Sequence, residues 1–190
     1  SKHREILMQV ESFMEERPDS ALIVLKSIDI EDDEYGQMLI HYVQGRLQQE
    51  EEDYPASIIS MFNAEKTAKK HGASDILGLI YYSLSDTYKS LYNPIEQQNY
   101  AQLAYNHFIL SGDTCHIYLG METLAEANYD NRNYDKSASL AQQMVTHEKA
   151  VPNPQIKIKG LRLLSSSYIK MQKYEEAKTT LHKLKKQADS

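Results

Sequence analysis

A pattern of residue sizes recurs every forty positions along this chain, in register and without an insertion. The recurrence is clearest at four small residues, Gly45, Ser85, Ala125 and Ser165. Four positions earlier stand larger residues, His41, Tyr81, Met121 and Leu161. Nine positions after the small residues stand Tyr54, Pro94, Tyr134 and Tyr174. Four copies in register predict an array of similar structural units, each too small to bury its apolar face alone.

Each copy is typical of two helices joined by a short turn. Gly72 and Gly112 suit helix ends, where a positive φ is needed. Capping oxygens are expected from three pairs of residues, Ser74–Asp75, Asp113–Thr114 and Asn153–Pro154. One-sided apolar spacing marks the second helices, as in Tyr174, Ala177, Leu181 and Leu184. We expect about seventeen residues in each helix at 1.5 Å rise, and small residues where paired helices come close.

The residues of the best copies resemble the tetratricopeptide repeat (TPR) family. The resemblance is carried by Leu164-Ser165-x-x-Tyr168 and then by Tyr174-x-x-Ala177-x-x-x-Leu181-x-x-Leu184. A second match is Leu124-Ala125 with Asn133-Tyr134-x-x-Ser137, and a third is Gly45 with Asp53-Tyr54. The copy at 81–112 is weaker, because Pro94 and Gln97 replace an aromatic residue and an alanine. The stride of forty also departs from the usual stride of about thirty-four, which we assign to longer helices.

The resemblance implies an all-α fold, a right-handed superhelical stack of antiparallel helix pairs with about ten helices. We expect a single domain over residues 1–190. Its repeats cover 35–72, 75–112, 114–150 and 154–187, after a degenerate first helix pair at 2–29. Aromatic residues on repeat positions, Tyr54 and Tyr174 among them, are expected to pack between helices.

Charge is distributed unevenly along the chain. The net charge is −6, yet residues 157–190 hold nine Lys and Arg against three acids, which is +6 and leaves −12 for residues 1–156. An acidic body disfavours binding to a phosphate backbone, so we expect no nucleic acid partner for this domain. No apolar run is long enough for membrane insertion by this segment. Cys115 is alone, so no internal disulfide is possible.

No pattern of a catalytic, cofactor-binding or metal site is found, and we expect no enzyme activity and no cofactor. The seven histidines never fall at zinc-ligand spacing, and no glycine-rich phosphate loop or nucleophile elbow occurs. The acidic runs 31–34 and 50–53 lack the spacing of a calcium loop. Glu122 and Glu126 share one helix face and leave a carboxylate pair open, although such surface pairs are common.

A peptide-binding groove is what the resemblance implies, lined by the first helix of each repeat. Carried over position by position, the groove residues are Tyr42, Arg46, Tyr82, Asp86, Lys89, Glu122, Glu126, Tyr129, Arg162 and Lys170. Aromatic and arginine anchors among mixed charges are typical of protein-binding surfaces. A clamp for acidic chaperone tails is not expected, because only Arg46 stands where that clamp needs a cation or an amide.

The expected function is non-catalytic binding of a protein or peptide, as the sensor or scaffold part of a larger bacterial regulatory protein. The run 14–21 is similar to the start of repeat regions in bacterial membrane-linked proteins. That similarity favours an extracytoplasmic domain of a membrane-anchored protein, with a cytoplasmic location as the alternative. The chain begins and ends in helix-like sequence, so we expect a piece of a longer protein.

The alternative function is a structural spacer or dimerisation module with no groove ligand. A homodimer through the C-terminal repeat, residues 173–190, is possible because a terminal repeat leaves Leu181 and Leu184 partly uncovered.

Overall fold

A computed structural model describes residues 2–27, 33–146 and 154–188, and within these ranges the fold is all-α. Ten helices are described: α1 (Lys2–Glu16), α2 (Pro18–Ser27), α3 (Glu34–Glu50), α4 (Tyr54–Lys70), α5 (Ser74–Ser90), α6 (Pro94–Ser111), α7 (Thr114–Asp130), α8 (Tyr134–Thr146), α9 (Pro154–Lys170) and α10 (Tyr174–Ala188). From α3 onward, first helices begin at 34, 74, 114 and 154 and second helices at 54, 94, 134 and 174. The predicted fold class is confirmed.

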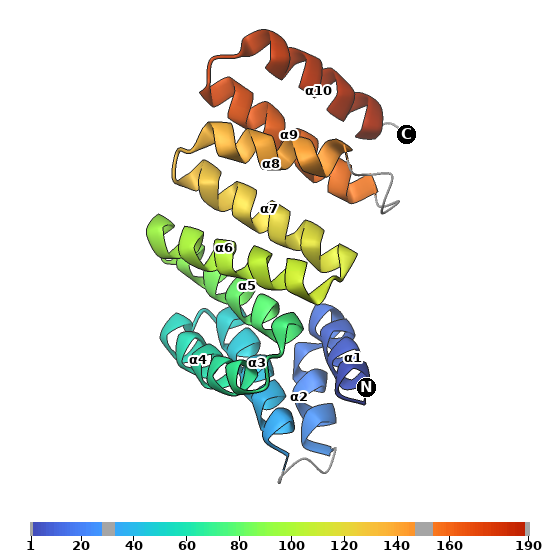
Figure 1. The fold of residues 1–190 in the computed structure, drawn as a ribbon, viewed down its shortest axis with the longest axis vertical. Coiled ribbons are helices and arrows are strands. Elements are labelled where there is room, and N and C mark those ends of the chain that lie inside the picture. The colour runs from blue at the N-terminus through green and yellow to red at the C-terminus, as the bar shows by residue number, and fades with distance from the viewer. Residues whose placement is uncertain (1, 28–32, 147–153, 189–190) are drawn as a thin grey trace.

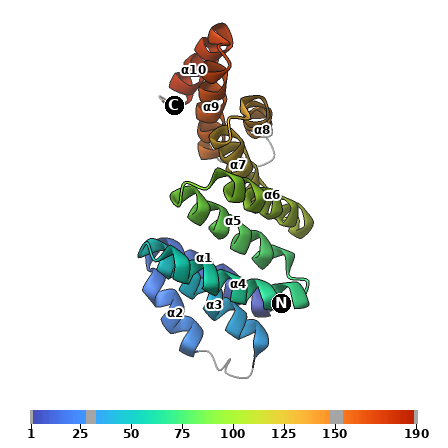
Figure 2. The same cartoon turned by 90° about the vertical axis from the view of Figure 1, so that its left-hand side faces the viewer.

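The helices stack in pairs along one axis (Figures 1 and 2), with α1 and α2 beside α3 and α10 at the far end of the stack. Each second helix packs against the first helix of the next pair, as α4 does on α5, α6 on α7 and α8 on α9. First helices of consecutive pairs also touch, α3 with α5, α5 with α7 and α7 with α9. Among the described residues, the second helices of consecutive pairs have no Cα atoms within 8 Å of one another. The stack therefore curves toward the first helices, which form its inner face.

Small residues let the two helices of a pair approach closely, as predicted. Gly45, Ser85, Ala125 and Ser165 are all buried. A Cβ on Gly45 would lie 2.8 Å from Met61 Cε, the terminal methyl of the facing helix. Ser57 Oγ donates to the carbonyl oxygen of Gly45 at 2.7 Å, and Ser85 Oγ donates to the carbonyl oxygen of Gln97 at 2.9 Å. Close approach thus also satisfies buried hydroxyl groups.

Every described turn inside a repeat places a residue other than glycine in the left-handed region. These residues are again forty apart, with φ between 55° and 63°: Glu52, Tyr92, Arg132 and Gln172. In each turn the next amide donates to the carbonyl five residues back, as Asn133 N does to Asn128 O at 2.8 Å. This is the Schellman helix end. The positive φ predicted for Gly72 and Gly112 is confirmed, but the four turns without glycine were not predicted.

Helix caps agree with the sequence only in part. Asp113 caps α7, its carboxylate accepting from His116 N at 3.0 Å. The prediction for Ser74 and Asp75 holds only in part: the N-cap of α5 is Ala73, which makes no side-chain cap hydrogen bond, but Asp75 Oδ1 accepts from Ile76 N of the first turn at 2.9 Å. Helix α5 begins two residues after Gly72, whose positive φ has already turned the backbone. The predicted cap at Asn153 lies outside the described residues.

The apolar core runs along the stack and thins toward its C-terminal end. Its largest cluster joins residues of α1 to α6, from Val10 to Phe108, and smaller clusters join α7, α8 and α9. The prediction that Tyr174 packs between helices is wrong, since 63% of its surface is exposed. The described residues place no further helix over α10, so this tyrosine lies on an open face. No described helix is both long and apolar enough to span a bilayer.

Candidate functional site

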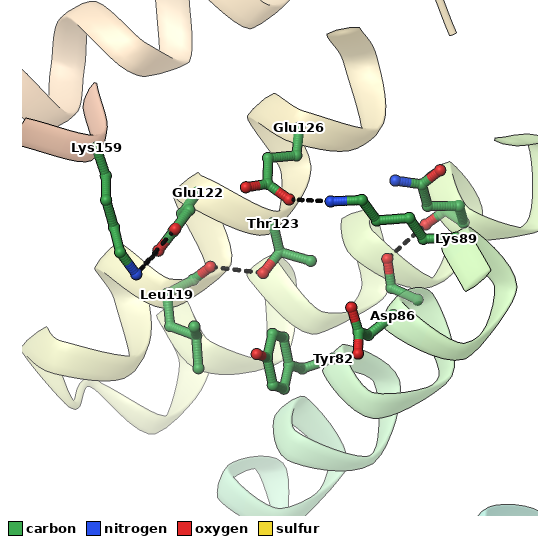
Figure 3. Close-up of a pocket in the computed structure, with 10 residues that line it drawn as sticks. Tyr82, Asp86, Lys89, Leu119, Glu122, Thr123, Glu126 and Lys159 are labelled. Atoms are coloured by element: carbon green, nitrogen blue, oxygen red, sulfur yellow. Dashed lines mark hydrogen bonds and ion pairs between the residues drawn. The ribbon is translucent and has the colours of Figure 1, made fainter. Parts of the chain in front are cut away.

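Two adjoining pockets open on the face formed by the first helices. One, of about 130 Å³, lies between α5 and α7 and is bordered by Lys159 of α9 (Figure 3). The other, of about 300 Å³, lies between α3 and α5 and includes Arg46. Tyr82 and Asp86 of α5 line both pockets. The pockets therefore adjoin along the inner face, one on each side of Tyr82 and Asp86, and together they are called the inner groove.

Side-chain bridges join consecutive first helices across this groove. The bridged residues are 37 positions apart: Gln49 Nε2 to Asp86 Oδ2 (2.6 Å), Lys89 Nζ to Glu126 Oε2 (2.8 Å) and Lys159 Nζ to Glu122 Oε1 (3.0 Å). The repeat is forty residues long, so a partner 37 positions away lies three residues before the equivalent position in the next repeat. Three residues are nearly one helical turn. Polar and charged side chains of consecutive first helices thus pair at a constant offset along the groove, and the bridges of Lys89 and Lys159 are visible in Figure 3.

The Asp86 carboxyl interacts with charged side chains from both pockets of the groove. Desolvation raises the pKa of its carboxyl, while Lys89 and Arg46 act in the opposite direction. Desolvation also raises the pKa of the Tyr82 hydroxyl, and the nearby Asp86 charge adds to that rise. Tyr82 therefore keeps its proton at neutral pH and can donate a hydrogen bond to a ligand carbonyl.

Tyr42 does not line the groove, and its assignment as an accessible groove residue is wrong. Its side chain is fully buried, in one cluster with Val10 and Met14 of α1. The extra pair at the N-terminus packs on α3 and covers this position. The Tyr42 hydroxyl accepts a hydrogen bond from Arg46 Nη1 at 3.0 Å. Tyr42 therefore positions the guanidinium that does line the groove.

Six of the ten predicted groove residues come together in the two pockets: Arg46, Tyr82, Asp86, Lys89, Glu122 and Glu126. Tyr129 is half-buried and lies edge-on against Tyr134, with ring centroids 5.3 Å apart. Arg162 and Lys170 are exposed on α9 and line neither pocket. The sequence prediction omitted Gln97, which borders the groove from the second helix of its repeat. Its departure from the alanine expected there was the available signal.

A separate contact ties α1 to α7 at the edge of the stack. Glu11 Oε1 lies 3.4 Å from His116 Nε2, and the His116 ring stacks on Phe108 with centroids 5.1 Å apart. The hydrogen bond with Glu11 raises the pKa of His116, whereas burial opposes that rise. Beside this contact is a cavity of about 450 Å³ that Cys115 also lines. No group of three metal-ligating side chains is found among the described residues.

Several solved structures share this arrangement of helices. BtubC (BKLC) from P. vanneervenii has a TM-score of 0.78 at 14% identity, over 98% of this chain and 79% of that chain. Two crystal structures of a putative kinesin light chain with nearly identical TPR-like repeats, from Podosopora anserina, have TM-scores of 0.71 at 12% identity. They match over 98% of this chain and 94% and 95% of those chains. The chain has a TPR-like fold.

The likeness is structural. No family model matches the sequence, and no curated protein matches it in sequence. At 12–14% identity, the likeness shows the TPR-like stack of helix pairs alone.

Proposed function

We propose that this chain is a non-catalytic TPR-like domain, a forty-residue variant of the repeat, that binds a protein or peptide along its inner groove. The TPR-like fold generally serves protein–protein interaction. The observation that carries the proposal is that Tyr82 and Asp86 line two adjoining pockets. An aromatic donor beside a carboxylate, between the two pockets of the inner groove, is a suitable anchor for a polypeptide.

The shape of the groove favours an extended chain over a small molecule. Its pockets are about 130 and 300 Å³, at or below the lower end of the range of about 300–1,000 Å³ for small-molecule sites. They lie in succession on α3, α5 and α7, so a segment of several residues is needed to fill both. Their lining is largely polar or charged, which suits the backbone amides and mixed side chains of a peptide.

The bridged charges can exchange partners with a ligand. The side chains of Lys89 and Glu126 are 46% and 40% exposed, so their ion pair is worth only about 0.2–1 kcal/mol. A peptide that presents both charge signs replaces such a pair at little cost. The groove therefore combines specificity from charge placement with an anchor at Tyr82.

We place this binding domain in a larger bacterial regulatory protein as its sensor or scaffold part. The support is the similarity of the run 14–21 to the start of repeat regions in membrane-linked bacterial proteins. The same similarity supports an extracytoplasmic location, with the cytoplasm as the alternative.

A second candidate function, a spacer or dimerisation module, is favoured by one observation. Tyr174 and Leu181 leave 63% and 45% of their surfaces exposed at the end of the stack. Such a module needs no ligand in the groove, and a groove substitution would leave its activity intact.

Two matched substitutions distinguish these functions. Tyr82→Ser removes the anchor of the groove, and Tyr92→Ser removes an aromatic ring that is 93% exposed in a turn. Proteins captured from lysate are compared by quantitative mass spectrometry for wild type and both variants. We expect Tyr82→Ser to lose a defined partner that Tyr92→Ser retains, with equal helicity by circular dichroism. Equal capture by all three proteins would contradict the groove.

A further inference from the structure

The C-terminal end of the stack carries an open apolar strip. Ile169 of α9 and Tyr174 and Leu181 of α10 are 47%, 63% and 45% exposed. With Ala177 they border a shallow cavity of about 370 Å³. The strip lies at the end of the stack where α10 is the last described helix (Figure 1).

In the preceding repeat, the corresponding face of α8 receives the next helix. Ala138 and Ala141 of α8 pack with Leu164 of α9. Val145 lies so close that a Cβ added to Gly160 of α9 would be 3.0 Å from its Cγ2 atom. Small and apolar side chains thus form the seat on which a further helix of the stack rests.

The stride of forty transfers these positions onto α10. Ala138, Ala141 and Val145 correspond to Lys178, Leu181 and Lys185. All three also line the open cavity. Helix α10 therefore offers a seat for a helix, with an apolar centre and two ammonium groups about two helical turns apart along one flank.

A helix of the same kind as α9 does not suit this seat. Packing small apolar residues over Lys178 and Lys185 would bury two ammonium groups without partners, which is costly. A helix with carboxylates along the flank of its apolar strip would pair with these ammonium groups. Residues 157–190 carry nine Lys and Arg against three acids, so the surrounding charge also attracts an acidic ligand.

We propose that the outer face of α10 binds an acidic amphipathic helix of a partner protein. Apolar residues of that helix cover Tyr174 and Leu181, and its Glu or Asp residues pair with Lys178 and Lys185. This surface is at the end of the stack and is distinct from the inner groove, so the inference stands without the proposed groove ligand.

Two other occupants suit the surface less well. In a symmetric dimer of this chain, the two lysine-flanked faces would meet, and like charges would oppose one another. A flat anionic membrane would contact the lysines but would not fill a concave seat of the kind that holds α9 on α8. Both occupants are nevertheless distinct outcomes of the test.

The test uses two labelled synthetic helices of about 18 residues with leucines at three-four spacing. One has glutamate and the other has lysine on both flanks. Fluorescence anisotropy measures their dissociation constants for the whole chain. We expect the glutamate peptide to bind about tenfold tighter or more than the lysine peptide, and its affinity to fall with salt.

Substitutions that reverse the charge of the two lysines then show whether the peptide binds at this face of α10. The double substitution Lys178→Glu with Lys185→Glu is expected to reverse the preference of the protein for the two peptides. Lys183→Glu with Lys186→Glu makes the same change of net charge outside this cavity and is expected to keep the preference. Leu181→Asp is expected to abolish binding with unchanged circular dichroism, because this side chain is 45% exposed.

Four results would overturn the inference. They are equal affinity for both peptides, no binding of the glutamate peptide, and a preference that the exchange at 178 and 185 leaves unchanged. The fourth is binding of a second copy of this chain, or of an anionic membrane, to the same face. Light scattering would then detect a dimer that Leu181→Asp dissociates, or phosphatidylserine vesicles would bind in a manner sensitive to that substitution.

Discussion

Lys89 and Glu126 belong to different repeats, 37 residues apart, yet their side chains meet at 2.8 Å across the inner groove. The same offset joins Gln49 to Asp86. Each first helix is therefore bridged to the next in the same register, three positions short of the repeat stride. That register decides which charges pair and which remain available to a ligand.

A double-mutant cycle with Lys89→Ala and Glu126→Ala measures this relationship. Both side chains are more than one-third exposed, so we expect a coupling free energy below about 1 kcal/mol. The coupling is expected to shrink further in high salt, because solvent ions screen an exposed pair. Urea denaturation provides the free energies of unfolding. A coupling of several kcal/mol would show that the pair is structural and is not exchangeable.

Substitution of Ser165 tests the repeat register. Its side chain is 3% exposed between paired helices, and Ser165→Leu would hold those helices apart. We expect a loss of about 1–3 kcal/mol or more in unfolding free energy, as for other overpacked sites. Ser166→Leu is the matched control, one residue away and half-buried, and is expected to cost less. Full tolerance of Ser165→Leu would be inconsistent with the close approach.

The positions that the sequence revealed are those that repeat within one helix pair. Ser85 and Ser165 could be assigned to a helix contact because small size at a fixed stride has a single simple cause. The pairing of Lys89 with Glu126 could not, because it depends on the register between first helices of consecutive repeats, which no periodicity within one repeat contains. The helix lengths and turns with glycine were accessible for the same local reasons.

Tyr42 and Arg132 show two further limits of the sequence. Tyr42 occupies the position that the resemblance assigns to the groove, but α1 covers it, and the packing of a degenerate extra pair was not predictable from the later repeats. Arg132 adopts a positive φ with no glycine to signal it. There the tertiary position of the next helix and the hydrogen bonds of the turn override the preference of the residue.

Arg132→Gly is expected to stabilise the protein. Arg132 has a φ of 63°, a conformation that costs a residue with a Cβ roughly 1–2 kcal/mol and costs glycine almost nothing. Part of that gain is lost to the greater freedom of glycine in the unfolded chain, so we expect a net increase of up to about 1 kcal/mol. Arg132→Ala, which keeps the Cβ, is the control and is expected to bring no such gain. Equal effects of the two substitutions in thermal unfolding would contradict the argument.

The contact between Glu11 and His116 predicts a pH dependence of stability. The hydrogen bond with Glu11 raises the pKa of His116 above its ordinary value of 6.5, with Asp113 and Asp75 acting in the same direction and burial against it. A raised pKa in the folded state stabilises that state fully below pH 6.5, and the contribution is lost as pH rises through the folded pKa. Wild type should therefore lose more stability than His116→Gln between about pH 6 and 8.

Glu11→Gln separates this contact from other titrating groups. It removes the carboxylate and keeps a side chain of the same size, so it should also reduce the pH dependence that distinguishes wild type from His116→Gln. Chemical denaturation at several pH values measures the difference. A His116→Gln variant with the same pH profile as wild type would contradict the assigned role.

Site-specific photo-crosslinking tests the inner groove as a binding site most directly. A photoreactive amino acid replaces Asp86 or Glu122 in the groove, or Phe62, which is 40% exposed on α4, as the control position. The account predicts that irradiation in lysate links one and the same polypeptide to both groove positions and not to position 62. Crosslinks at position 62 alone, or no difference among the three positions, would contradict it.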